Sequence, residues 1–311
     1  MDALTAIFVS PFLDMAGSPV FFAEVIVVGL LTGVMYSLVA LGFVLIFKAS
    51  GVFNFAQGAM VLFAALTLVG LMERGAPVWL ALIAAASVMV IVAVVIERLV
   101  LRPLVNQPEI ILFMATIGIA FFLEGFGETV WGSDVHRLDV GIPDKSFDFA
   151  GMLLNEFDIW AAVIGAMMVV GLTIFLKKTA IGRALRAVAD DHQAALSVGI
   201  PLKTIWIIVW SVAGFVGLVA GIMWGSKSGV QFSLSLIALK ALPVLILGGF
   251  TSVPGAIVGG LIIGVGEKIA EIYWGPLVGG AIENWFAYML AMVFLLFRPQ
   301  GLFGERIIER V

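Results

Sequence analysis

The sequence predicts an all-α polytopic membrane protein with about eight to nine transmembrane helices, including broken or short helices. Two observations lead to this fold class. Hydrophobic residues make up 62% of the chain and charged residues only 12%, well below the charged share of an ordinary soluble domain. The apolar residues gather in runs near the roughly 20 residues that a helix needs to cross a bilayer. These runs lack the period-two alternation that is typical of an outer-membrane barrel.

Each apolar run is predicted to be a helix, because an open sheet edge in lipid would leave backbone groups unsatisfied. The predicted spans are residues 22–47, 53–72, 78–101, 110–130, 159–176, 204–225 and 283–297, and a broken apolar region covers 236–272. The N-terminus carries Asp2 and Asp14 and no basic region, so we expect no cleaved signal peptide. The whole chain, 1–311, is expected to form a single transmembrane domain.

Several kinds of chemistry are excluded by missing residues. The chain has no cysteine, which excludes disulfides and thiolate sites. It contains no G-x-x-x-x-G-K-[ST] run and therefore no P-loop of its own for nucleotide phosphates. His136 and His192 are the only histidines, and both fall in predicted polar loops, which makes them weak candidates for a proton relay. We therefore expect neither an enzyme nor a bound cofactor or metal, and we expect no nucleic-acid partner.

The distribution of Lys and Arg predicts the orientation in the membrane. With the N-terminus outside, the internal segments hold eleven of these residues: Lys48, Arg98, Arg102, Lys177, Lys178, Arg183, Arg186, Lys203, Arg298, Arg306 and Arg310. The external segments hold four: Arg74, Arg137, Lys145 and Lys227. The loop from Trp131 to Asp158 is rich in carboxylates, which suits the outer face. Since cytoplasmic loops carry the excess of Lys and Arg, residues 177–203 are predicted to be cytoplasmic.

The segment 177–203 is a conspicuous polar interruption between apolar runs. Thr179 fits a helix N-cap, Gly199 fits a C′ position, and Pro201 would stop any continuation. The apolar residues at near-helical spacing are Ile181, Leu185, Val188 and Ala195, and those on another face are Arg183, Arg186 and Asp190. This pattern predicts a short amphipathic helix outside the bilayer that a partner can bind. The alternative is a solvated connector whose charges only fix the topology.

Two apolar regions are interrupted, one in each half of the chain. Residues 47–58 read FKASGVFNFAQG, and residues 247–256 read LGGFTSVPGA. Paired interruptions are typical of a translocation pathway, although small residues also permit tight helix packing. The uncharged polar residues at or near the interruptions are the pathway candidates: Asn54, Gln57, Thr116 and Ser252. Alternatively, these side chains satisfy the loosened backbone groups.

Charged residues within or beside the spans are weighed separately, because burying them in a bilayer is costly. Glu97 and Arg98 lie at a span end, where both are expected to reach the interface. Glu124 lies deeper and either pairs internally or faces a cavity. Four charges flank the broken region, and we expect them to form ion pairs within the chain rather than substrate contacts: Lys240, Glu267, Lys268 and Glu271.

Six short motifs, taken in order, resemble those of the inner-membrane permeases of high-affinity branched-chain amino acid ABC importers, the Liv type. The motifs are NFAQG at 54–58, RP at 102–103, TIG at 116–118, GRALRA at 182–187, LGGFTSVPGA at 247–256 and RPQGLFG at 298–304. The resemblance runs from about Glu24 to Gly304. Ser197 departs from it, because a bulkier apolar residue is expected before the Gly199–Ile200 pair.

The resemblance implies a permease subunit of an ATP-driven importer in the bacterial inner membrane. Its implied partners are two cytoplasmic ABC ATPases, a second permease that is related or identical, a periplasmic substrate-binding protein and membrane lipid. Residues 177–203 would be the cytoplasmic coupling loop, with these ATPase-coupling residues: Thr179, Gly182, Arg183, Leu185, Arg186, Asp190 and Gly199. The implied substrates are branched-chain amino acids or related small organic solutes. The alternative is an ion-gradient-driven secondary transporter that uses Glu124 or Glu267.

Overall fold

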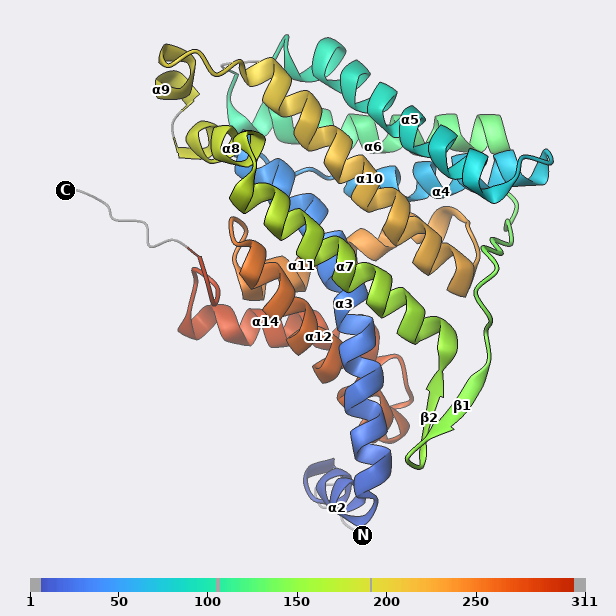
Figure 1. Cartoon of the computed structure of the whole chain (residues 1–311). Coiled ribbons are helices and arrows are strands. Elements are labelled where there is room, and N and C mark those ends of the chain that lie inside the picture. Colours follow the sequence, from blue (N-terminus) through green and yellow to red (C-terminus); the bar gives the residue numbers. More distant parts are fainter. Residues whose placement is uncertain (1–6, 105–106, 191, 305–311) are drawn as a thin grey trace. The chain divides into compact units, whose positions relative to one another are not determined.

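The structure is a computed structural model, and it describes residues 7–104, 107–190 and 192–304 (Figure 1). Helices dominate it, as predicted. In chain order the elements begin with α2 (Ser10–Gly17), α3 (Pro19–Ser50), α4 (Gln57–Glu73), α5 (Val78–Ile96), the π-helix η1 (Glu97–Leu101), α6 (Glu109–Trp131), β1 (Ser146–Phe149), β2 (Met152–Asn155) and α7 (Glu156–Lys178). They continue with α8 (Ala180–Asp190), α9 (His192–Ser197), α10 (Leu202–Ser228), the 3₁₀ turn η2 (Phe232–Leu236), α11 (Ile237–Gly248), α12 (Val253–Tyr273), α13 (Gly275–Val278), the 3₁₀ turn η3 (Ile282–Asn284) and α14 (Phe286–Phe297).

Within the described residues, six helices are long and apolar enough to cross a membrane: α3, α5 with η1, α6, α7, α10 and α12. Three shorter apolar helices accompany them, formed by α4, by η2 with α11, and by α14. This set confirms the polytopic all-α prediction, short helices included. Helix α12 belongs to the region 236–272 that was predicted to be broken, yet with 21 residues it is long enough to span.

Because of the first interruption, helix α4 begins later in the sequence than predicted. The sequence predicted a span from residue 53, but α4 begins at Gln57. Gly51 adopts a left-handed conformation with φ of 71° after α3 ends at Ser50, and residues 51–56 form no helix. We call residues 51–56 the first break and residues 249–252, between α11 and α12, the second break.

A β-hairpin stands in the acidic loop where the sequence predicted no regular element. Strands β1 and β2 pair antiparallel, with Ser146 opposite Asn155 and Phe149 opposite Met152. Its two-residue turn, Ala150–Gly151, has positive φ at both positions (57° and 85°), which matches the twist of paired strands. The sequence signal was weak because the usual Asn-Gly or Asp-Gly pair is replaced by Ala-Gly.

The chain divides into two compact units that are interleaved in sequence. Within the described residues, one unit contains residues 7–37, Gly141–Ala166 and residues 240–304. The other contains Leu38–Val140 and Met167–Leu239. We call them the hairpin unit and the α4 unit.

Helix α4 is the core of the α4 unit. Every residue from Gln57 to Gly70 is buried, and α5, α6, α10 and η2 all pack against this helix. An apolar helix without a polar face belongs in the centre of such a bundle, which explains why α4 shows no amphipathic pattern.

The hairpin unit is built on a close crossing of α3 and α12. A methyl group added at Gly29 would lie 2.7 Å from the Cα of Val265, and one at Gly33 would lie 2.7 Å from the carbonyl oxygen of Gly260. The Ser37 hydroxyl lies 2.8 Å from the carbonyl oxygen of Gly33 and 3.2 Å from that of Ile257, to one of which it donates. Small residues let these helix backbones touch, as is common between membrane helices.

Candidate functional site

The candidate coupling segment begins at a tight corner between α7 and α8 (Figure 1). The Thr179 hydroxyl donates to the carbonyl oxygen of Phe175 at 2.6 Å and accepts from the backbone N–H of Gly182 at 3.1 Å. This geometry confirms Thr179 as the N-cap of α8. A methyl group at Gly182 would overlap the carbonyl oxygen of Leu176, so the corner requires glycine there.

The two arginines of the segment have different surroundings. Arg186 is half-buried, and its Nη1 donates to the carbonyl oxygen of Leu176 at 2.8 Å, one of the last carbonyls of α7. Arg183 is exposed, and its Nη1 lies 3.3 Å from the carbonyl oxygen of Lys178. Arg186 therefore helps to hold α8 on α7, while the side chain of Arg183 remains exposed to solvent.

Helix α8 is amphipathic, as predicted. Leu185 and Val188 are buried, and the helix packs against α10 within the α4 unit. Asp190 lies at its end and is exposed like Arg183. The apolar face thus fixes the helix, and the charged face is free to contact a partner.

Helix α9 ends as the sequence predicted. Gly199 has φ of 85°, its N–H donates to the carbonyl oxygen of Leu196 at 3.0 Å, and the N–H of Ile200 donates to that of Ala195 at 3.0 Å. These two bonds form a Schellman motif. Beside it, the side chains of Leu196 and Val198 are 53% and 75% exposed. Large apolar side chains exposed in a polar segment indicate a contact surface.

The first break is held by polar side chains. The backbone N–H of Phe55 donates to Thr116 Oγ1 at 3.2 Å, and that of Ala56 donates to Asn54 Oδ1 at 3.0 Å. Gln57 Nε2 donates to the carbonyl oxygen of Ala213 at 3.4 Å. Asn54, Gln57 and Thr116 are all buried, so in this conformation they serve the backbone. Their contact with a translocation pathway stays a prediction.

The second break is closed mainly by backbone. Ser252 Oγ accepts from the N–H of Gly255 at 3.0 Å and caps α12. A methyl group at Gly255 would overlap the carbonyl oxygen of Gly248, and one at Gly259 would lie 2.6 Å from that of Val244. The carbonyls of Leu247 and Gly248 accept from the N–H groups of Leu302 and Phe303, at 2.8 and 3.1 Å. Helices α11 and α12 thus form a tight hairpin, and the RPQGLFG segment binds its connecting turn.

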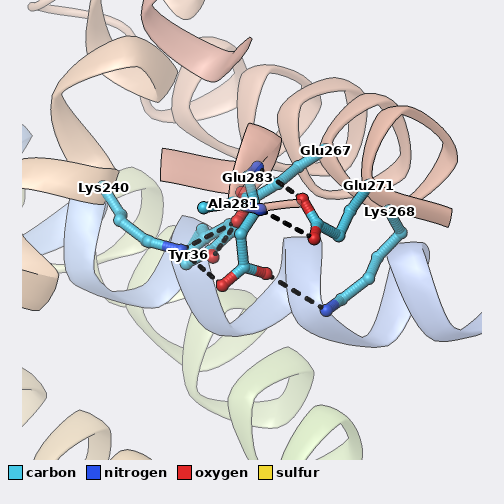
Figure 2. Close-up of polar contacts among 7 residues, drawn as sticks. All are labelled: Tyr36, Lys240, Glu267, Lys268, Glu271, Ala281 and Glu283. Atoms are coloured by element: carbon cyan, nitrogen blue, oxygen red, sulfur yellow. Dashed lines mark hydrogen bonds and ion pairs between the residues drawn. The ribbon is translucent and has the colours of Figure 1, made fainter. Parts of the chain in front are cut away.

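An ion network lies at the other end of that hairpin (Figure 2). Lys240 Nζ lies 2.9 Å from Glu267 Oε1 and 3.6 Å from Glu283 Oε1, and Lys268 Nζ lies 3.7 Å from Glu283 Oε2. The Tyr36 hydroxyl donates to Glu267 Oε1 at 3.0 Å. The ion pair expected at Lys240 and Glu267 is confirmed, whereas Tyr36 and Glu283 were missed because they are far away in sequence.

Two carboxylates of the network are buried or bound to backbone rather than open to a solute. Glu267 is 1% exposed, and its Oε2 has no hydrogen-bond partner within the part of the chain that the structure describes. Glu271 accepts from the backbone N–H groups of Ala281 and Glu283, at 3.2 and 2.9 Å. The network therefore ties α3, α11, α12 and η3 together.

The expectation that Glu97 reaches the interface is wrong. Glu97 is 1% exposed and is bound by Arg102 through contacts of 3.0 to 3.1 Å. The π-helical turn, which bonds residue i to i+5, places these two residues over each other. Arg98 is exposed, as expected. Glu124 is half-buried near the Ser235 side chain, and its internal pairing stays a prediction.

The comparisons with known proteins agree with one another. A family model described as the permease component of branched-chain amino acid transport systems matches residues 25–298. The high-affinity branched-chain amino acid transport system permease protein BraD of Pseudomonas aeruginosa is 29% identical over 306 residues, covering 93% of this chain and 98% of that protein. LivH of Escherichia coli, a permease protein of the same description, is 28% identical over 304 residues, covering 91% and 96%.

A relative that matches over a shorter stretch is named for a different solute. The L-arabinose transport system permease protein AraH of Escherichia coli is 32% identical over 150 residues, covering 47% of this chain and 42% of that protein. No solved structure matches the chain.

Proposed function

The chain belongs to the family of permease components of branched-chain amino acid transport systems, and from this premise we propose that residues 177–203 form the coupling loop through which a separate ATPase drives it. The observation that carries the proposal is the exposure of Arg183 on α8 and of Leu196 and Val198 at the end of α9. We call these three residues the coupling surface.

The corner between α7 and α8 explains how the loop would transmit motion. Thr179 and Arg186 both donate to carbonyl oxygens in the last turn of α7, and Gly182 brings the two backbones into contact. A push on α8 therefore moves the end of α7 with it instead of bending a flexible linker. Rigid packed helices transmit such shifts because they have discrete arrangements rather than a continuous range.

The remaining subunits are proposed from the family. Because the chain has no P-loop, ATP would be hydrolysed on separate subunits. Membership of a family of transport-system permease components supports the expected set of partners: two cytoplasmic ABC ATPases, a second permease that is related or identical, and a periplasmic binding protein. The chain is then a multi-pass protein of the bacterial inner membrane, one permease domain from end to end, with the basic segments inside.

The substrate is a branched-chain amino acid or a related small organic solute. The two relatives that match along almost their full length are named for branched-chain amino acids, while the shorter match is named for L-arabinose. Gradient-driven transport is less well supported, because Glu267, a carboxylate that such a carrier would use, is bound by Lys240 and Tyr36.

The test is a double substitution on the coupling surface, Leu196→Asp with Val198→Asp. Because both side chains are exposed, membrane insertion should survive. Loss of two apolar anchors at the centre of an interface should weaken ATPase association by at least about tenfold. The measurements are co-purification with the ATPase subunits and ATP-driven uptake into proteoliposomes.

Phe149→Asp, on the exposed β-hairpin, is the matched control and should leave both measurements unchanged. Normal ATPase association in the double variant would overturn the coupling proposal. Uptake that continues without ATP but depends on an ion gradient, and that Glu124→Gln abolishes, would support the secondary-transporter alternative.

A further inference from the structure

An apolar pocket in the α4 unit is not explained by transport. Its volume is about 530 Å³, which is in the range of small-molecule sites. Helices α5 and α6 form its walls and Phe63 of α4 contributes from below. Both walls pack against α4, but in the described chain they make no comparable contact with each other, so the pocket is the groove left between them.

The lining is suited to hydrocarbon. It consists of Gly, Ala, Val, Ile, Leu and Phe residues, and no side chain in it can make a hydrogen bond. A solute with an ammonium and a carboxylate group would lose its hydration here without replacement, which excludes the pocket as an amino-acid site. The walls are also poorly buried: in the most apolar window of each span, only 28% of α5 with η1 and 22% of α6 are buried. Much of each wall is therefore left uncovered by the described chain.

The two ends of the pocket differ. At one end the ring of Phe126 contacts those of Phe63 and Phe122, with centroids 6.0 and 5.7 Å apart. At the other end the lining residues are Leu99 and Val100 of the π-helix η1. The pocket is therefore closed by aromatic rings at one end and borders the last turn of a span at the other.

A basic residue accompanies the η1 end. Arg98 directly precedes Leu99, is exposed, and has no hydrogen bond or ion pair with any other described residue. Its neighbour Arg102 is neutralised by the buried Glu97. The π turn thus pairs one arginine internally and leaves one exposed positive charge next in sequence to a lining residue of the groove.

We propose that this pocket is a binding site for an anionic phospholipid, with an acyl chain between α5 and α6 and the phosphate on Arg98. Hydrocarbon fills the apolar groove, and the unpaired guanidinium supplies the complementary charge for a phosphate. Basic sites beside spans on the cytoplasmic side commonly recognise anionic lipid headgroups, and the charge distribution of the chain assigns Arg98 to that side. The proposal does not depend on the transported solute.

The experiment compares two glycine substitutions on α6. A methyl group added at Gly118, which lines the pocket, or at Gly125, which does not, would meet no atom within 4 Å. Both Gly118→Leu and Gly125→Leu should therefore fold. The full-length protein is purified from membranes in mild detergent, and bound phosphatidylglycerol is quantified by native mass spectrometry and lipid extraction. Gly118→Leu should reduce retained lipid more than about tenfold, because its side chain occupies space for several methylene groups.

The headgroup contact is tested in nanodiscs that contain phosphatidylglycerol and phosphatidylcholine. Arg98→Gln should reduce the preference for phosphatidylglycerol about fivefold, while the control Arg137→Gln, an exposed arginine on the opposite predicted side, should not. Equal lipid retention by the two glycine variants, or no bound lipid in the unchanged protein, would overturn the proposal. The proposal would also be overturned if the purified protein held no lipid and Gly118→Leu dissociated two permease subunits. The groove would then be a protein interface.

Discussion

Between Ser50 and Gln57 the loosened backbone is held by side chains, whereas between Gly248 and Val253 it is held by other backbone. Asn54 and Thr116 supply the acceptors for the first break. At the second break, Gly248 and Gly255 touch, and the RPQGLFG segment caps the freed carbonyls. The two interruptions look similar in the sequence but should respond to different kinds of substitution. The first depends on hydrogen-bonding groups, and the second depends on the absence of side chains.

The largest effect is expected for Gly255→Ala in the second break. The new methyl group would overlap the carbonyl oxygen of Gly248, and a backbone atom cannot move aside as a side chain can. We expect a loss of stability above about 3 kcal/mol, beyond ordinary overpacking. Thermal unfolding in detergent, followed by size-exclusion chromatography, measures it.

Gly171→Ala in α7 is the matched control, because a methyl group there meets nothing within 4 Å. That substitution should be neutral or stabilise slightly, since alanine favours helices more than glycine does. Equal melting temperatures for the two variants would show that the second break is not closed by glycine contact.

The next effect is expected at the far end of the same hairpin. Lys240→Met removes the cation from Glu267, which is 1% exposed and would keep only the Tyr36 hydroxyl. Breaking a buried pair by removing one partner costs about 3 kcal/mol or more. We therefore expect a clear drop in melting temperature, which Glu267→Gln in the same chain should partly restore.

Lys268→Met serves as the control, because among the described residues the ion pair of Lys268 is with the part-exposed Glu283, at 3.7 Å. Part-exposed pairs contribute about 1 kcal/mol or less. If the Lys240 and Lys268 variants lost the same stability, the buried pair would not be what joins α11 to α12.

Much of this arrangement could be predicted from the sequence. Apolar runs placed the spans, the Gly and Pro clusters placed both breaks, and Thr179 and Gly199 marked the ends of the α8–α9 segment. These signals are local, so a single sequence contains them. The partners of the buried charges are not local: Tyr36 meets Glu267 across 231 positions, and no periodicity encodes such a contact. The burial of Glu97 was missed because its place at a span end suggested the interface, and the sequence does not mark the π turn that brings Arg102 to it.

The smallest losses of stability are expected for substitutions of the polar side chains at the two breaks, and they test the difference between the breaks. Thr116→Val keeps the shape of the side chain but removes the acceptor for Phe55 N–H and the hydroxyl beside the carbonyls of Phe53 and Phe113. Because Thr116 is buried, about 1–3 kcal/mol should be lost. Ser252→Ala removes one partly buried cap and should cost about 1 kcal/mol or less. Melting temperatures of the two variants, with Thr116→Ser and Ser252→Thr as hydroxyl-retaining controls, give the order. A larger loss at Ser252 would mean that the second break also depends on its side chains, and the contrast with the first break would fail.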